Sequence, residues 1–192
     1  AQHLIHVVDG GSTDGTREIV ARLTEQSANT GGPSIELLEN PDQFVAQARN
    51  ISLAAMPEQA THVLEMIGHV WVPADHIERR MEDFDSLVNS LGESEGGGDS
   101  GDKVAGAGVL GSKVAGVGTL VRESDQPLGP VGRWVEASLQ NPMASGRGQF
   151  AQFSGQERSL VPPFTLYRRT ALEATGGWDE RYITTQDSEL NM

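Results

Sequence analysis

The chain has 192 residues, 27 of them acidic and 14 basic, and a formal net charge of −13 at pH 7. This excess of negative charge argues against a basic surface that binds nucleic acid. The chain has no cysteine, which excludes disulfides and thiolate metal sites. It is long enough for one domain with a sizeable core, and it holds no apolar run of the length that spans a membrane.

The first segment, residues 4–23, has the pattern of a buried strand, a tight loop and a helix. An apolar run ends at Asp9, and glycine, serine and threonine follow it. Apolar residues then recur at helical spacing: Ile19, Val20 and Leu23. Thr13 or Asp14 is the predicted N-cap of this helix.

Asp9 stands where ligands bind in open α/β sheets, because the carboxyl ends of parallel strands form a crevice there. The next two residues, Gly10 and Gly11, have no Cβ atom that would keep a ligand away from the backbone. An ordinary turn between a strand and a helix also favours Asp, Gly and Ser. On spacing alone, both interpretations of this loop stay open.

The string Val-Val-Asp-Gly-Gly-Ser-Thr-Asp-Gly-Thr at residues 7–16 resembles the nucleotide-binding signature of family 2 glycosyltransferases, which have the GT-A fold. In that family the signature follows the second strand of the sheet, and its acid contacts the base of a nucleotide-sugar. The resemblance implies that the nucleotide-sugar is bound by Asp9, Gly10, Gly11, Ser12 and Asp14.

A GT-A domain has a further strand and helix before this signature, whereas this chain opens only a few residues before it. We therefore expect a fragment of a GT-A domain that lacks the usual first strand. A sheet without that strand exposes an unpaired edge or an apolar helix face.

The next stretch contains a short predicted strand, residues 35–38, and a helix that opens within residues 40–50 and continues to Met56. Its Ala48-Arg49-Asn50 triplet is similar to another family 2 motif. That similarity implies that Arg49 contacts the diphosphate or the base of the donor, for which a planar guanidinium is well suited. The alternative is a solvent-facing arginine on a surface helix.

A third buried strand is predicted over residues 63–67, followed by a helix with Pro73 near its first turn. In family 2 this strand ends in Asp-x-Asp or Asp-x-His, whose side chains hold a divalent metal. Here the triplet is Ile67-Gly68-His69, and isoleucine cannot bind a metal. His69 is therefore the candidate ligand for Mg²⁺ or Mn²⁺, although these ions prefer carboxylates. A hydrogen-bonded loop histidine is the alternative, and Glu65, on the same face one pleat deeper, is a weaker candidate ligand.

Residues 74–91 form a predicted helix whose apolar stripe we assign to the core: Ile77, Met81, Phe84, Leu87, Val88 and Leu91. The acidic, glycine-rich segment 92–102 has too little apolar surface to order itself, which predicts a flexible loop within the same domain. Segment 103–122 repeats Gly, Ala and Val in two similar halves, the pattern of a small duplication or of a glycine-rich strand pair.

A helix is predicted over residues 130–139, with Trp134 and Leu139 available to pack. The loop that follows, residues 141–150, resembles the substrate-site loop of succinoglycan-type exopolysaccharide glycosyltransferases. Arg147 in this loop is a candidate contact for a phosphate or the acceptor, and a surface arginine is the equal alternative.

The last segment contains a Gly-Gly-Trp-Asp-Glu block at residues 176–180 and a Gln-Asp-x-Glu-Leu block at residues 186–190. Together they resemble the acceptor-side motif of family 2, in which an acid at the start of a helix is the general base for the acceptor hydroxyl. By this resemblance Asp187 is the base, and the helix N-terminus keeps its carboxylate ionised. A simple N-cap role is the alternative.

These four motifs imply one partial glycosyltransferase domain over residues 1–192, with an α/β, GT-A-like fold: a mostly parallel sheet with helices on both faces. The implied reaction transfers a sugar, with inversion, from a nucleotide-sugar (most often a UDP-sugar) to a saccharide or lipid-linked acceptor. Asp187 deprotonates the acceptor hydroxyl, and a divalent metal and Arg49 stabilise the departing diphosphate. We expect a cytoplasmic location, or the inner face of the cell membrane through segments outside this chain.

Two other functions stay open. Ile67 in the metal triplet and the missing first strand also fit a non-catalytic relative, or an inactive fragment, that only binds a nucleotide-sugar or a partner. A sugar nucleotidyltransferase shares the general layout, but the blocks at residues 176–180 and 186–190 argue against it.

Overall fold

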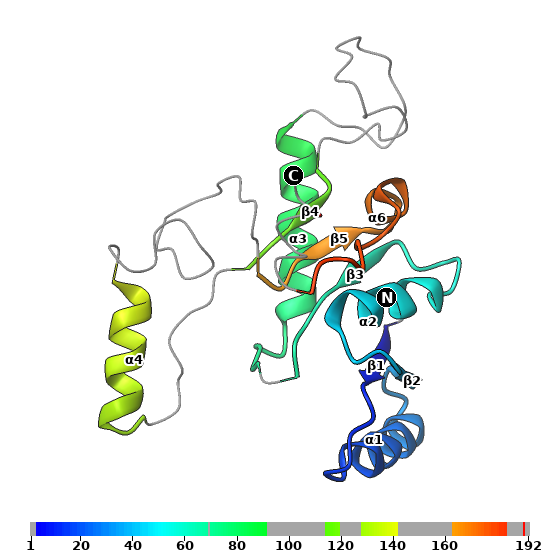
Figure 1. The fold of residues 1–192 in the computed structure, drawn as a ribbon. Coiled ribbons are helices and arrows are strands. Elements are labelled where there is room, and N and C mark those ends of the chain that lie inside the picture. Colours follow the sequence, from blue (N-terminus) through cyan, green and yellow to red (C-terminus); the bar gives the residue numbers. More distant parts are fainter. Residues whose placement is uncertain are drawn as a thin grey trace. The chain divides into compact units, whose positions relative to one another are not determined.

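The computed structural model describes residues 3–68, 70–91, 114–119, 128–141, 163–183 and 190. Their helices and strands are shown in Figure 1. The chain forms two compact units, the first from residues 1–60 with 175–190 and the second from residues 61–174 with 191–192. Among the described residues, each unit contains one small β-sheet.

The first unit is built on two parallel strands, β1 (Leu4–Asp9) and β2 (Ser34–Glu39), which pair in register along their whole length. α1 (Thr16–Thr30) makes the long connection that parallel neighbours require. α2 (Val45–Ala54) follows β2. Because the strands are parallel, the loops after β1 and β2 leave the sheet at the same edge.

The two helices lie on opposite faces of this strand pair. Nδ1 of the His6 ring on β1 lies 3.0 Å from the Ser52 hydroxyl oxygen of α2, whereas Asp9 faces Arg17 of α1. His6 and Asp9 are three residues apart, so their side chains point to opposite faces of the strand. The expected helices on both faces are therefore present at this parallel pair.

The first unit exposes apolar side chains to solvent. Within the described residues β1 pairs only with β2, so its other edge is open. Of the three apolar residues at helical spacing in α1, Val20 is buried, but Ile19 and Leu23 are 48% and 44% exposed. The sequence predicts an unpaired strand edge or an exposed apolar helix face, and the described part of the chain has both.

The start of α1 differs from its predicted position. The N-cap is Gly15, with a φ of 87°, and not Thr13 or Asp14. Asp14 instead accepts hydrogen bonds at one carboxylate oxygen from the Thr16 N–H and hydroxyl, at 3.1 and 2.6 Å. Asp14 forms this turn one residue before the N-cap. The N-cap position itself is left-handed and is occupied by Gly15.

Two further helix ends also differ from the prediction. α1 continues past the expected end near Gln26 to Thr30, and Gly31, with a φ of 69°, ends it. α2 begins only at Val45, because residues 40–43 form a turn closed by the Gln43 N–H and the Asn40 carbonyl at 3.2 Å.

The second unit contains an antiparallel sheet in the order β3 (His62–Leu64), β5 (Leu166–Arg168) and β4 (Gly116–Val117). α3 (His76–Ser90) packs against it. The core consists of Phe84, Val114 and Leu166, with Leu64, Met81, Leu87, Val88 and Val117 packed around them. The predicted core stripe of α3 is therefore largely confirmed, although Leu91, just after the helix, is 47% exposed.

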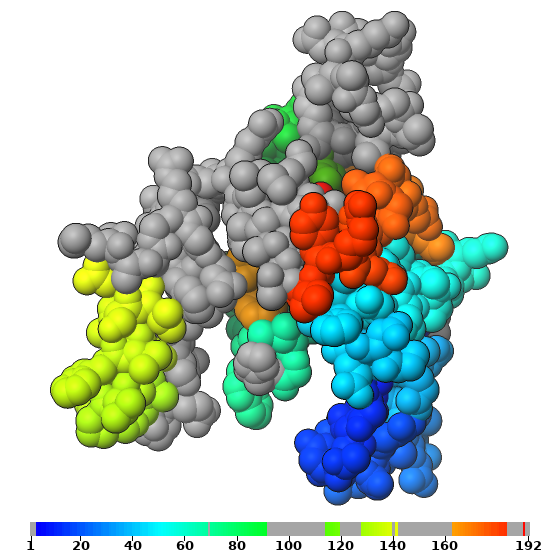
Figure 2. Space-filling view, viewed as in Figure 1, coloured from blue at the N-terminus to red at the C-terminus, as the bar shows by residue number. Residues whose placement is uncertain are grey.

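Two more helices belong to the described part of this unit. α6 (Arg169–Thr175) follows β5 directly, and α4 (Pro130–Gln140) includes the predicted helix 130–139. Figure 2 gives the space-filling view of the described residues. Four apolar side chains of α4 are exposed: Val131, Trp134, Val135 and Leu139. No helix in the described segments is both long and apolar enough to cross a membrane.

The α/β class is confirmed, but the described strands do not form the mostly parallel sheet expected. Only β1 and β2 are parallel, whereas β3, β5 and β4 are antiparallel. Hydrophobic periodicity marks a strand without giving the direction of its partner, and β5 runs back along β3 so that Val63 pairs with Tyr167. The strand predicted over residues 63–67 ends at Leu64. The predicted flexible loop 92–102 lies outside the described residues.

Candidate functional site

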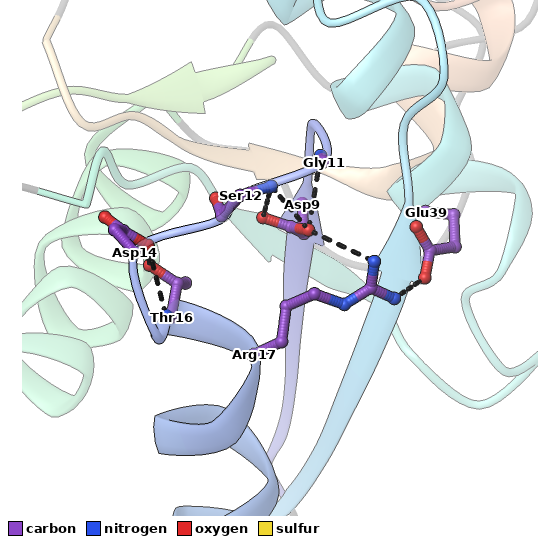
Figure 3. Close-up of polar contacts among 7 residues, drawn as sticks. All are labelled: Asp9, Gly11, Ser12, Asp14, Thr16, Arg17 and Glu39. Atoms are coloured by element: carbon purple, nitrogen blue, oxygen red, sulfur yellow. Dashed lines mark hydrogen bonds and ion pairs between the residues drawn. The ribbon is translucent and has the colours of Figure 1, made fainter.

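Asp9 is the centre of the first group of site residues (Figure 3). It is the last residue of β1 and is 4% exposed. Its carboxylate accepts a hydrogen bond from the Gly11 N–H at 3.2 Å and from the Ser12 N–H at 3.2 Å. The loop after β1 therefore folds back over the carboxylate of the residue that precedes it.

These contacts keep Asp9 ionised. A hydrogen bond from the Ser12 side chain is the largest cause that lowers the pKa of Asp9, and the N–H groups of Ser12 and Gly11 and the positive charge of Arg17 lower it further. Burial acts in the opposite direction, but the net pKa lies below the ordinary value of 3.8. A nearly buried carboxylate at this edge is thus a permanent acceptor at neutral pH.

Arg17, in the first turn of α1, joins the ends of the two parallel strands (Figure 3). Its Nη1 lies 3.8 Å from Oδ2 of Asp9, and its Nη2 is paired with Oε1 of Glu39. Asp9 and Glu39 are register partners at the ends of β1 and β2. The sequence prediction missed Arg17, although its position one turn after the glycine loop places it near the strand ends.

Asn40 follows β2 and packs beside Asp9. It is 4% exposed, its N–H donates to the Asp9 main-chain carbonyl at 2.8 Å, and its Nδ2 donates to the Phe44 carbonyl at 3.0 Å. Its Oδ1 is buried and accepts no hydrogen bond from the described residues. The prediction did not select Asn40 for the site, yet parallel pairing requires that the residues after β1 and β2 meet.

Gln43 covers the two glycines of the loop. A Cβ atom on Gly10 would lie 3.5 Å from Cγ of Gln43, and one on Gly11 would lie 3.7 Å from its Nε2. Gln43 itself has a φ of 64°, which is rare for a residue with a side chain. The open backbone expected at Gly10 and Gly11 is therefore lined by an amide side chain from the turn after β2.

Asp14 contacts the start of α1 and not the residues around Asp9. Its carboxylate is exposed and accepts from Thr16, whose side-chain hydrogen bond is the largest cause that lowers the pKa of Asp14. In Figure 3 the Asp14 carboxylate is hydrogen-bonded to Thr16, whereas the Asp9 carboxylate is hydrogen-bonded to Gly11 and Ser12. Of the five residues predicted from the signature, Asp14 is the one whose contacts are purely with the helix start.

Arg49 and its neighbour Asn50 form a second group, with residues of the distant Gly-Gly-Trp-Asp-Glu block. The Arg49 guanidinium carbon lies 5.6 Å from the centre of the Trp178 ring, a cation–π arrangement. Asn50 Nδ2 donates to the Trp178 carbonyl at 2.8 Å and to Glu180 at 2.9 Å, and Asn50 Oδ1 accepts from the Trp178 N–H at 2.9 Å. Two motifs that lie 128 residues apart thus meet within the first unit.

The same block carries an ion pair between Asp179 and Arg181. The Arg181 guanidinium donates to both carboxylate oxygens of Asp179, at distances from 2.5 to 3.0 Å. The Arg181 side-chain hydrogen bond is the largest cause that lowers the pKa of Asp179 to about 2. This carboxylate is therefore committed to Arg181 and is a poor candidate for a base.

Three candidate site residues, His69, Arg147 and Asp187, lie outside the described residues. Ile67, which stands where the resembled family has a metal-binding acid, is 41% exposed and offers no ligating atom. No group of three or more His, Asp or Glu side chains in the described segments could hold a metal ion. The described residues do not fit a metal centre, so metal binding through His69 and proton transfer through Asp187 stay predictions.

The chain is similar to the succinoglycan biosynthesis protein ExoA of Rhizobium meliloti (strain 1021), with 30% identity over 190 residues. The alignment covers 96% of this chain and 46% of that protein, so the chain spans about half the length of this curated relative. No protein-family model matches the chain, and no solved structure matches it significantly. The chain is thus a distant relative of a protein of succinoglycan biosynthesis.

Proposed function

We propose that the chain is the donor-binding part of a glycosyltransferase that acts in exopolysaccharide biosynthesis. It would transfer a sugar from a UDP-sugar to a saccharide or lipid-linked acceptor with inversion. The observation that carries the proposal is the buried, ionised carboxylate of Asp9 at the carboxyl ends of two parallel strands. The similarity to a succinoglycan biosynthesis protein supports the exopolysaccharide context.

The proposed binding mode follows from the chemistry of the two residue groups. Asp9 is an acceptor for an N–H of the nucleotide base, since a carboxylate offers about four lone-pair positions, and the Gly11 N–H, the Ser12 N–H and the Ser12 side chain use three of them. Gln43 adds amide donors and an acceptor beside the same loop. Arg49 is the cation for the diphosphate, since a guanidinium donates two parallel hydrogen bonds to phosphate oxygens.

In the proposed reaction Asp187 takes the proton from the acceptor hydroxyl. The oxygen attacks the anomeric carbon of the sugar, a new C–O bond forms, and the bond to the diphosphate oxygen breaks. The nucleoside diphosphate leaves with the electron pair, and Arg49 balances its negative charge. A single displacement of this kind inverts the configuration at the anomeric carbon.

A second candidate is a domain of the same fold that binds a nucleotide-sugar without transferring it. The exposed Ile67 favours this candidate, because a ligating acid is absent at that position. Both candidates share the nucleotide site and differ only in turnover.

Turnover separates the two candidates. We would measure release of UDP from a panel of UDP-sugars in the presence of Mn²⁺ and a saccharide acceptor mixture, for the unsubstituted chain and for Asp187→Asn. Glu25→Gln, an exposed carboxylate of α1, is the control. If Asp187→Asn reduces transfer by about a hundredfold or more and Glu25→Gln leaves it intact, the result supports the enzyme. Absence of transfer, even after Ile67→Asp restores an acid, supports the binding-only domain.

A further inference from the structure

Asn50 holds the backbone of Trp178 by both halves of its amide group. Its Nδ2 donates to the Trp178 carbonyl at 2.8 Å, and its Oδ1 accepts from the Trp178 N–H at 2.9 Å. A third hydrogen bond runs from Nδ2 to Oε1 of Glu180 at 2.9 Å. An asparagine amide that pairs with both the N–H and the C=O of one residue replaces the hydrogen bonds of a neighbouring strand, so this segment depends on Asn50 for its backbone pairing.

The glycine before Trp178 is what lets Asn50 come this close. A Cβ atom on Gly177 would lie 2.5 Å from Oδ1 of Asn50, which is closer than any real Cβ contact. The φ of Gly177 is +82°, a conformation that disfavours residues with a side chain. The contacts of Asn50 with this segment therefore depend on the glycine. We call the four residues Asn50, Gly177, Trp178 and Glu180 the Asn50 clamp.

The clamp supports Arg49 as well as the 176–180 block. Trp178 is 3% exposed, and the Arg49 guanidinium lies over its ring at 5.6 Å. Stacking on an aromatic ring uses the face of a guanidinium, whereas phosphate binding uses the N–H groups at its edge. A guanidinium held on a fixed ring is thus preorganised for a phosphate, because less rotational freedom is lost on binding.

We propose that Asn50 is a positioning residue for the donor site: it fixes Trp178, and Trp178 fixes the Arg49 guanidinium in the orientation that binds the diphosphate. The inference rests on the proposed function, in which Arg49 contacts the donor. It also gives the Ala48-Arg49-Asn50 triplet a division of labour, since Arg49 serves the donor and Asn50 anchors the segment that leads along the chain toward Asp187.

The first arm of the test asks whether Asn50 holds Trp178, independently of any ligand. Trp71 and Trp134, which are 93% and 75% exposed, are replaced by Phe so that Trp178 is the sole tryptophan, and its emission is excited selectively over that of the two tyrosines. We expect Asn50→Ala to shift the emission maximum of Trp178 to longer wavelength and to raise its acrylamide quenching severalfold. Asn29→Ala, an exposed asparagine of α1, is the matched control and should change neither. Unchanged emission in Asn50→Ala overturns the inference.

The second arm measures the dissociation constant of UDP, with Mn²⁺, for Arg49→Ala, Asn50→Ala and the double variant. If Asn50 acts through Arg49, each single substitution weakens UDP binding about tenfold, and the double variant is about tenfold rather than a hundredfold weaker. A merely structural role for Asn50 lowers the melting temperature without this shared loss. If Asn50→Ala does not fold, Asn50→Asp, which keeps the acceptor for the Trp178 N–H and loses the donor, enters the same cycle.

The outcomes distinguish the inference from the function on which it rests. Suppose that Arg49→Ala weakens UDP binding and Asn50→Ala does not, although the first arm shows that Asn50→Ala frees Trp178. This result overturns the inference and leaves the proposed donor site unchanged. Additive losses also overturn it. Absence of UDP binding to the unsubstituted chain contradicts the proposed function itself, and the positioning role then falls with it even if the first arm succeeds.

Discussion

The N–H of Asn40 donates a 2.8 Å hydrogen bond to the main-chain carbonyl of Asp9, at the point where two parallel strands end side by side. This bond continues the pairing of β1 and β2 by one residue into their loops. It draws the turn after β2, with Gln43, over the glycines that follow Asp9. The site is therefore shaped by two loops that are fastened to each other, and not by the signature loop alone.

Asn40→Ala should destabilise the first unit. The substitution removes the hydrogen bond from Nδ2 to the Phe44 carbonyl. It also leaves a cavity, because Asn40 is only 4% exposed. We expect the free energy of unfolding to fall by about 1–3 kcal/mol, as measured by urea denaturation. Asn29→Ala, at an exposed position, should cost less than about 0.5 kcal/mol. Equal midpoints for the two variants would show that the Asn40 side chain does not stabilise the turn after β2.

Gly177→Ala tests the fit between Gly177 and Asn50 against its neighbour Gly176→Ala. Both glycines have a positive φ, 82° and 81°, so both substitutions introduce similar backbone strain. Only at Gly177 would the new Cβ meet another group, Oδ1 of Asn50 at 2.5 Å, whereas Gly176 faces open space. Strain alone costs about 1–3 kcal/mol, and we expect Gly177→Ala to lose clearly more stability than Gly176→Ala. Equal losses of stability in the two variants would mean that the Asn50 side chain moves away from the new Cβ atom at no cost.

Arg17→Gln separates a binding role from a stabilising one. The Arg17 side chain is 41% exposed, so its ion pairs with Asp9 and Glu39 are screened by solvent and contribute less than about 1 kcal/mol. The guanidinium nevertheless lies beside the Asp9 carboxylate, which we propose binds the nucleotide base, and helps to orient it. We therefore expect a small change in the urea midpoint and a severalfold weaker affinity for UDP. Arg22→Gln, at an exposed position of the same helix, is the control; equal UDP affinities in the two variants would remove Arg17 from the site.

The pH dependence of stability should report on Asp9. Its pKa in the folded chain lies below the ordinary 3.8, so the folded state favours the ionised form. The corresponding stability is fully present above about pH 4 and is lost as the pH falls through the lower, folded pKa. Asp14 and Asp179 are shifted in the same direction and contribute to the same acid transition.

Asp9→Asn removes one of these three contributions. We expect the free energy of unfolding of this variant to fall less steeply between pH 5 and pH 3 than that of the unsubstituted chain, because one group fewer takes up a proton on unfolding. Identical slopes in the two proteins would contradict the contacts described for the Asp9 carboxylate.

The sequence predicts the framework of the first unit well, and the physical reason is local. The apolar run before Asp9, the glycines after it and the helical spacing beyond are all within one βαβ connection, so β1, α1 and β2 follow from neighbouring residues. The exact helix ends do not follow in the same way. They depend on the left-handed conformations of Gly15 and Gly31, which composition alone does not assign to one glycine among several.

The contacts that complete the site depend on partners far away in sequence. Asn50 and Trp178 are 128 residues apart, and nothing in the helical pattern around Asn50 indicates that its amide pairs with a backbone. The antiparallel direction of β5 is likewise a property of the folded unit. The resemblance to family 2 glycosyltransferases pointed to both motifs, but not to their contact.

We propose that the loops after β1 and β2 bind the nucleotide through Asp9. The decisive measurement is isothermal titration of UDP, with and without Mn²⁺, into the unsubstituted chain, Asp9→Asn and the control Glu25→Gln, an exposed carboxylate of α1. We expect UDP binding that Asp9→Asn weakens about tenfold or more and that Glu25→Gln leaves unchanged. Absence of binding to the unsubstituted chain, or equal affinities in all three proteins, would contradict it.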